Sequence, residues 1–159
     1  MELPSPVRPP SAPDATLLIR ILVGGVFVSE GIQKFLYPDS VGAGRFERIG
    51  LPFPELMAPF VGVTEVVFGA LVLVGLFTRF AVIPLLVIMA VAIVTTKIPI
   101  LLGREMGPFA LRDVDYYGFF GMAHASRNDF AMIMGSLFLL IVGPCRFSLD
   151  ARRARDQRP

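Results

Sequence analysis

Cysteine and charged residues are scarce in this sequence. It contains one cysteine, Cys145, and 18% charged residues, against about 25% in ordinary soluble domains. A single cysteine excludes an intrachain disulfide, a CxxC redox pair and a cysteine-rich metal site. The low share of charge and the net charge of only +2 argue against a nucleic-acid-binding protein and against a disordered one.

Apolar residues are what the sequence has in excess. They make up 54% of its 159 residues, against roughly 45–50% in soluble domains, and the mean hydropathy is +0.67. The length corresponds to about one domain, and a soluble domain of that size could not keep so much apolar surface away from water. The composition therefore indicates a protein of the lipid bilayer.

Four apolar segments follow a proline-rich start. Residues 1–14 contain five prolines and predict a disordered tail. The segments are Thr16–Phe35, Glu55–Phe77, Arg79 to about Ile98, where Pro99 is expected to end or kink the helix, and a shorter run from Asn128 to Val142. They predict an all-α, polytopic membrane protein. Its antiparallel bundle of four transmembrane helices occupies residues 15–147, and a basic cytoplasmic tail occupies 148–159.

The arginines are biased towards the side of the termini. With four spans, the long loops Leu36–Pro54 and Gly103–Arg127 share one side of the membrane, and both termini share the other. The side of the termini carries seven arginines and the loop side carries five. The C-terminal arginines lie within about 15–20 residues of a span, where the positive-inside rule applies. We therefore expect both termini to be cytoplasmic.

Five ionisable residues interrupt the apolar segments, and each costs at least about 2.5–3.5 kcal/mol near the bilayer centre. They are Arg20, Glu30, Lys34, Glu65 and Lys97. Helical periodicity puts Arg20 and Lys34 on one face of the first helix, with Glu30 beside that face. An apolar site with two carboxylates and several cations would suit a small anion or a quinone headgroup. The alternative is structural, because the three cations lie near helix ends and can extend to water.

Glu65 is the deepest of these residues and cannot reach water along its own short side chain. It lies between Gly62 and Gly69, whose spacing lets a neighbouring helix approach closely. It is therefore expected to be paired, protonated or facing a polar cavity. A cation of the first helix is the expected partner, with Arg20 preferred over Lys34.

The loop Gly103–Arg127 mixes acids, tyrosines, phenylalanines and the only histidine. The spacing of Asp113, Asp115 and His124 matches no metal-ligand motif, so no metal site is predicted. Tyr and Phe favour the headgroup region, and they predict an aromatic lid at the membrane interface. No nucleotide-binding or hydrolase motif supports those classes of enzyme.

Three stretches form a pattern by their order and spacing. Arg20 and the GIQKF sequence at 31–35 come first, followed by Glu65, Gly69 and the VGLFTR turn at 74–79. The last is GPCRFSLD at 143–150. Together they resemble the DoxX family of small four-helix membrane proteins over roughly residues 17–150. Cys145 departs from the family pattern, which usually has glycine at that position.

The resemblance implies a bacterial plasma-membrane protein linked to oxidoreductase complexes. Some relatives are subunits of thiosulfate:quinone oxidoreductases, and others belong to membrane complexes that handle oxidative or thiol stress. The first hypothesis is therefore a membrane subunit without redox centres of its own, with a quinone pocket around the buried charges and a soluble oxidoreductase partner. The second is a non-catalytic scaffold or assembly protein whose buried charges fix helix register. No cofactor other than a quinone is indicated, and a homo-oligomer is compatible with both.

Overall fold

The computed structural model describes residues 13–156, so the predicted tail at 1–14 lies almost wholly outside the described residues. Within that range the secondary structure is helical, without a β-strand. The helices are α1 (Thr16–Leu36), α2 (Ala43–Arg48), α3 (Pro54–Val74), α4 (Thr78–Ala92), a π-helical segment (Ile93–Lys97), α5 (Ile98–Leu102), α6 (Phe119–Ala125), α7 (Arg127–Val142) and α8 (Leu149–Asp156). Three of them lie in segments for which the sequence predicted loops or a tail: α2 and α6 in the two long loops, and α8 in the C-terminal tail.

The membrane-spanning segments confirm the predicted all-α bundle. Three helices in the described range, α1, α3 and the continuous helix Thr78–Leu102, are each long and apolar enough to cross a bilayer. α6 and α7 are long and apolar enough only when they are counted together, and the two helices are bent by 63° at the break between them. Counted as one broken span, they form the fourth candidate, which begins at Phe119 and not at Asn128, where the sequence predicted its start.

Glycines bring α1 and α3 into close contact. A methyl group on Gly31 would lie 2.6 Å from the carbonyl oxygen of Gly62, and one on Gly24 would lie 2.7 Å from that of Gly69. Small residues at this spacing let two helix backbones pack directly against each other. The close approach expected from Gly62 and Gly69 is therefore made by α1, which carries the buried charges.

The third span continues past Pro99 to Leu102. Pro99 occupies the first turn of α5, where its missing N–H is not needed. The π-helical segment before it changes the hydrogen-bonding step, and the N–H of Ile98 donates to the carbonyl of Ile93. The widened turn accommodates the proline, and the helix extends beyond its predicted end near Ile98.

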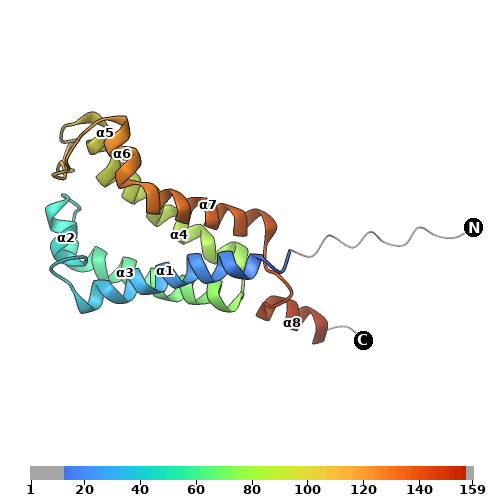
Figure 1. The fold of residues 1–159 in the computed structure, drawn as a ribbon. Helices are drawn as coiled ribbons and strands as arrows, with labels where there is room; N and C mark the ends of the chain where they lie inside the picture. Colours follow the sequence, from blue (N-terminus) through green and yellow to red (C-terminus); the bar gives the residue numbers. More distant parts are fainter. Residues whose placement is uncertain (1–12, 157–159) are drawn as a thin grey trace, which may run out of the picture.

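The long helices form two pairs that diverge like the arms of a V (Figure 1). One pair is α1 with α3 and the other is α4 with α7. The pairs meet at the end of the bundle where α1 begins and α7 ends, here called the terminal end, and separate towards α2, α5 and α6, here called the loop end. A buried apolar core joins the pairs: Val23, Phe27, Val72, Ala81, Val82, Leu85, Met132 and Leu139.

Candidate functional site: a polar cavity between the helix pairs

A cavity of about 470 Å³ lies between the two helix pairs, on the loop side of the apolar core. Phe27 and Met132 belong to both the core and the cavity wall, so the core forms its floor. Six charged side chains line it, and three positive charges match three negative ones: Glu30, Lys34, Arg45, Glu65, Lys97 and Asp129. Ligand pockets in proteins commonly enclose roughly 300–1,000 Å³, and this cavity is within that range.

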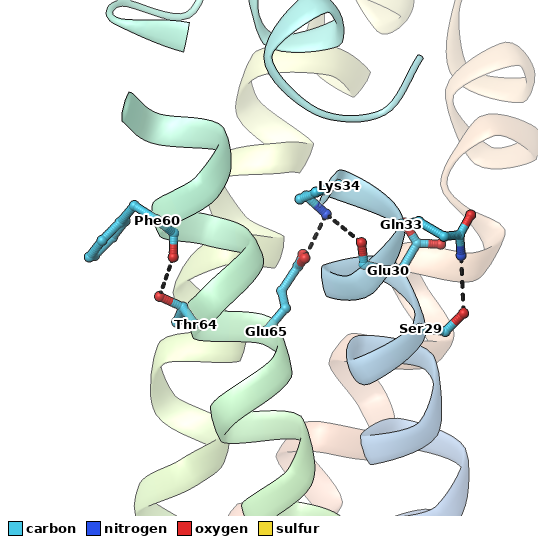
Figure 2. Close-up of polar contacts among 7 residues, drawn as sticks. All are labelled: Ser29, Glu30, Gln33, Lys34, Phe60, Thr64 and Glu65. Carbon is cyan, nitrogen blue, oxygen red and sulfur yellow. Dashed lines mark hydrogen bonds and ion pairs between the residues drawn. The ribbon is translucent and has the colours of Figure 1, made fainter. Parts of the chain in front are cut away.

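Lys34 and Glu65 form the first ion pair in the cavity wall (Figure 2). The Nζ of Lys34 lies 2.6 Å from Oε2 of Glu65, and both side chains are less than a tenth exposed. Lys34 also donates to the backbone carbonyl of Glu30, one turn earlier in α1, at 3.4 Å. The close contact of Gly31 with α3 sets the distance between the helices, and Lys34 reaches Glu65 across it.

Lys97 and Asp129 form a second ion pair on the opposite helix pair. Their Nζ and Oδ2 atoms lie 3.1 Å apart, and both side chains are largely buried. Lys97 ends the π-helical segment, and Asp129 lies in the first turn of α7, just after the bend in the fourth span. The π-helical segment and the bend between α6 and α7 therefore meet at this ion pair. Such π-helical turns are frequent at functional sites.

Glu30 and Arg45 complete the charged lining without an ion pair among the described residues. The side chain of Glu30 makes no hydrogen bond there, and only its backbone carbonyl accepts one from Lys34. Thr95 and Thr96 also line the cavity, but their hydroxyls donate to the carbonyls of Val91 and Ala92 in the preceding turn. The lysines and Glu30 are therefore the polar groups best placed to meet a ligand.

The cavity lining includes exposed apolar side chains on α3 and α4. Phe60 of α3 and Val87 and Val91 of α4 line the cavity, and these side chains are 63%, 57% and 46% exposed. They lie on membrane-spanning helices, so the surface they expose faces hydrocarbon. A molecule dissolved in the bilayer could therefore enter from the side, with its polar end directed towards the ion pairs.

Arg20 is remote from this cavity, and the prediction that it pairs with Glu65 is wrong. Arg20 is 1% exposed, and its guanidinium donates to the carbonyls of Val72, Leu73 and Phe147. The antiparallel packing puts Arg20 beside the end of α3, two turns of helix beyond Glu65. Lys34 is at the level of Glu65 instead.

The backbone at Gly75 is shaped around the Arg20 guanidinium. Gly75 ends α3 with a φ of +69°, and a methyl group there would lie 2.6 Å from the guanidinium carbon of Arg20. Arg20 also lies 3.5 Å from the sulfur of Cys145, which is fully buried. These contacts tie α1, α3 and the segment before α8 together, so Arg20 is a structural residue of the terminal end.

The site predicted from the sequence omitted two charged residues of the cavity and included Arg20, which lies elsewhere. Lys34, Glu65, Glu30 and Lys97 do line one cavity, as their place near the loop side suggested. Asp129, next to the predicted start of the fourth segment, and Arg45, in the predicted loop Leu36–Pro54, were not among the predicted site residues. One signal could have identified Asp129, namely that it is a carboxylate at the edge of an apolar span on the same side as Lys97.

The acidic side chains and the histidine of the aromatic loop do not gather into one cluster in the described residues. In residues 13–156 no three His, Cys, Asp or Glu side chains gather closely enough to hold a metal ion. His124 instead contacts the guanidinium of Arg127, and its ring lies 6.2 Å from that of Tyr116. Phe119 and Phe120 are exposed next to it, as the proposed interfacial lid requires.

Comparison with known proteins identifies the family. The family model of DoxX matches residues 15–98. The chain belongs to the DoxX family. The uncharacterized membrane protein Rv3486 of Mycobacterium tuberculosis is 52% identical over 143 residues, which cover 90% of this chain and 83% of that protein. No solved structure was found to match. The DoxX match contains all five predicted site residues, whereas Asp129 lies beyond it.

Proposed function

We propose that this DoxX protein is the membrane subunit of an oxidoreductase complex and that its cavity binds the headgroup of a membrane quinone. The observation that carries the proposal is a cavity with two ion pairs in its wall and with exposed apolar side chains of α3 and α4 in its lining. A quinone is a neutral ring on a long apolar tail, and it reaches its enzymes through the bilayer. The lining charges balance, which suits a neutral headgroup better than an anion.

The lining residues fit the chemistry of such a headgroup. Ring carbonyl oxygens accept hydrogen bonds, and the ammonium groups of Lys34 and Lys97 each carry three N–H donors, not all of which their carboxylate partners use. Glu65 and Asp129 hold the two ammonium groups in place. Val26, Val61 and Ile88 provide apolar walls. A bound quinone would supply two-electron redox chemistry coupled to proton exchange, for which Glu30 is the uncommitted carboxylate.

A soluble partner would exchange electrons with this subunit. The sequence has no cysteine pair and no pattern of haem ligation, so its own residues offer no resident redox centre. The cavity is on the loop side of the core, and a partner that acts on its ligand is expected at the loop end of the bundle.

Quinone binding tests the proposal directly. Purified full-length protein is titrated with a short-tailed quinone analogue, and its dissociation constant is compared among wild type, Lys34→Met, Lys97→Met and Arg104→Met. The two cavity variants should bind at least tenfold more weakly, because each removes a donor to the headgroup. Arg104 is exposed outside the cavity, so Arg104→Met should bind like wild type.

Two results would contradict the proposal. One is a wild-type protein that neither binds the analogue nor co-purifies with quinone. The other is undiminished binding by both lysine variants. Either result, in protein that keeps its helical content, would favour the scaffold hypothesis, in which the ion pairs only fix helix register.

The proposed orientation puts both termini in the cytoplasm of a bacterial cell and the cavity in the outer half of the plasma membrane. It is supported by the arginines of the terminal end, according to the positive-inside rule. Reporter fusions test it: a reporter active only in the cytoplasm should work at the C-terminus, and one active only outside should work within Gly103–Arg127. The reverse pattern would invert the orientation.

A further inference from the structure

The terminal end of the bundle has an excess of exposed positive charge. The segments at this end whose side chains are described, 13–15, 75–79 and 143–153, contain four arginines and two aspartates. Arg79, Arg146, Arg152 and Arg153 are all exposed. At the loop end, segments 37–55 and 103–127 contain five arginines and six acidic residues. The excess is therefore a property of one end and not of the whole protein.

The two aspartates neutralise little of that charge. Asp14 pairs with Arg146 at 2.7 Å, but both side chains are at least half exposed. Exposed pairs of this kind contribute little and are screened by salt. Asp150 accepts a hydrogen bond from the backbone N–H of Phe77, so its carboxylate binds the turn before α4 and not an arginine. Arg152 and Arg153 have no acidic partner within residues 13–153, whose side chains the structure describes.

Exposed phenylalanines surround the arginines. Phe77, Phe80 and Phe147 are 56%, 72% and 53% exposed, although all three lie next to the ends of membrane-spanning helices. The guanidinium of Arg146 lies 4.7 Å from the centre of the Phe147 ring. Aromatic rings beside cations are typical of the depth at which lipid headgroups meet the acyl chains.

Helix α8 is fixed to this end of the bundle by specific hydrogen bonds. The N–H of Asp150 donates to the carbonyl of Gly75, and the Ser148 hydroxyl caps α8 by accepting from the N–H of Ala151. Arg20 holds the preceding carbonyl, that of Phe147. Arg152 and Arg153 are therefore held close to the ends of α3 and α4, and Figure 1 shows α8 beside that end.

We propose that the terminal end is a docking surface for the headgroups of anionic phospholipids, with Arg152 and Arg153 of α8 as its main charged contacts. A negative headgroup complements the unmatched arginines, and its acyl chains would lie along the exposed phenylalanines. Arginine suits this ligand because its planar guanidinium can donate two hydrogen bonds to one phosphate. This site is independent of the cavity, which lies on the other side of the core.

Lipid titration tests the proposal on the full-length protein. Native mass spectrometry of detergent-solubilised protein measures the affinity for phosphatidylglycerol and for phosphatidylcholine, in wild type and in the double variant Arg152→Gln/Arg153→Gln. Wild type should prefer phosphatidylglycerol, and the double variant should lose at least fivefold in that affinity, since one arginine near a lipid surface accounts for about fivefold. Phosphatidylcholine affinity should not change.

A matched variant separates a local site from general charge. Arg104→Gln/Arg112→Gln removes the same charge from exposed positions at the loop end and should keep the wild-type preference. Arg152→Lys/Arg153→Lys should retain most of it, which also shows that the Gln variant fails through charge and not through misfolding. The proposal is overturned if the loop-end variant loses as much affinity, if the Lys variant loses as much as the Gln variant, or if the α8 Gln variant loses none.

Discussion

The two ends of the bundle use buried cations in opposite ways. At the terminal end Arg20 is enclosed by the backbone, and its partners are the carbonyls of Val72, Leu73 and Phe147. At the loop end Lys34 and Lys97 are paired with carboxylates, and both lie in the wall of a cavity. Arg20 stabilises the junction between α1, α3 and the segment before α8. The two lysines remain accessible to a third molecule.

This difference shows that the role of a charged residue inside an apolar helix depends on its partner and its surroundings. A guanidinium can satisfy several carbonyls at the C-terminal end of a helix, where the helix dipole also favours a positive charge. An ammonium paired with one carboxylate keeps donors that point elsewhere. All three residues look alike in the sequence, as isolated cations in apolar segments.

Arg20→Met should cause the largest loss of stability. It removes a donor from three carbonyls, of which only that of Val72 keeps another, from the N–H of Gly75. At roughly 1–3 kcal/mol for each of the other two carbonyls, we expect a loss of about 4 kcal/mol in the free energy of unfolding. Chemical unfolding in detergent, followed by circular dichroism, measures the loss. Arg104→Met, at an exposed position, is the control and should change stability by less than about 0.5 kcal/mol. An equal effect of both variants would remove the special role assigned to Arg20.

Glu65→Gln and Lys34→Met should each cost about 2 kcal/mol. This is less than the 3–5 kcal/mol typical of a buried pair, because water in the cavity can hydrate the remaining charge. The double variant should cost less than the sum of the single variants by about 1 kcal/mol, since the residues are in contact. The combination of Glu65→Gln with Arg20→Met should instead be additive. Coupling between Glu65 and Arg20 would contradict the assignment of partners given by the structure.

Gly24→Ala and Gly25→Ala should have small effects of opposite sign. A methyl group on Gly24 would meet the backbone of α3, which costs about 1–2 kcal/mol of overpacking. A methyl group on Gly25 meets nothing within 4 Å, and replacing glycine in a helix should stabilise by roughly 0.5–1 kcal/mol. Thermal unfolding of the two variants under identical conditions measures both. Similar effects at the two positions would show that α1 and α3 do not pack through Gly24.

Helix boundaries were predictable where apolarity and proline define them. α1 and α3 begin and end within a few residues of their predicted limits, because the bilayer requires about 20 apolar residues. Pro38 follows the end of α1, Pro54 begins α3 and Gly75 ends it. Neither the bend between α6 and α7 nor the π-helical segment before Pro99 was predicted. The π-helical segment depends on hydrogen bonds that shift by one residue, which composition does not reveal. α8 was missed because its composition is that of a charged tail, and its anchoring depends on contacts with Gly75 and Phe77.

The sequence by itself determined that this is a membrane protein with several apolar segments, that it belongs to the DoxX family, and that its intramembrane charges need partners. Those properties depend on composition, segment length and the cost of burying charge, which are local. Only the tertiary structure decided that Lys34, and not Arg20, meets Glu65, and that Asp129 pairs with Lys97. Partner choice depends on how far one helix is shifted along another, and the Gly31–Gly62 contact sets that shift for α1 and α3. The cavity follows from the same packing, because close contact at the terminal end leaves the loop end of the bundle open.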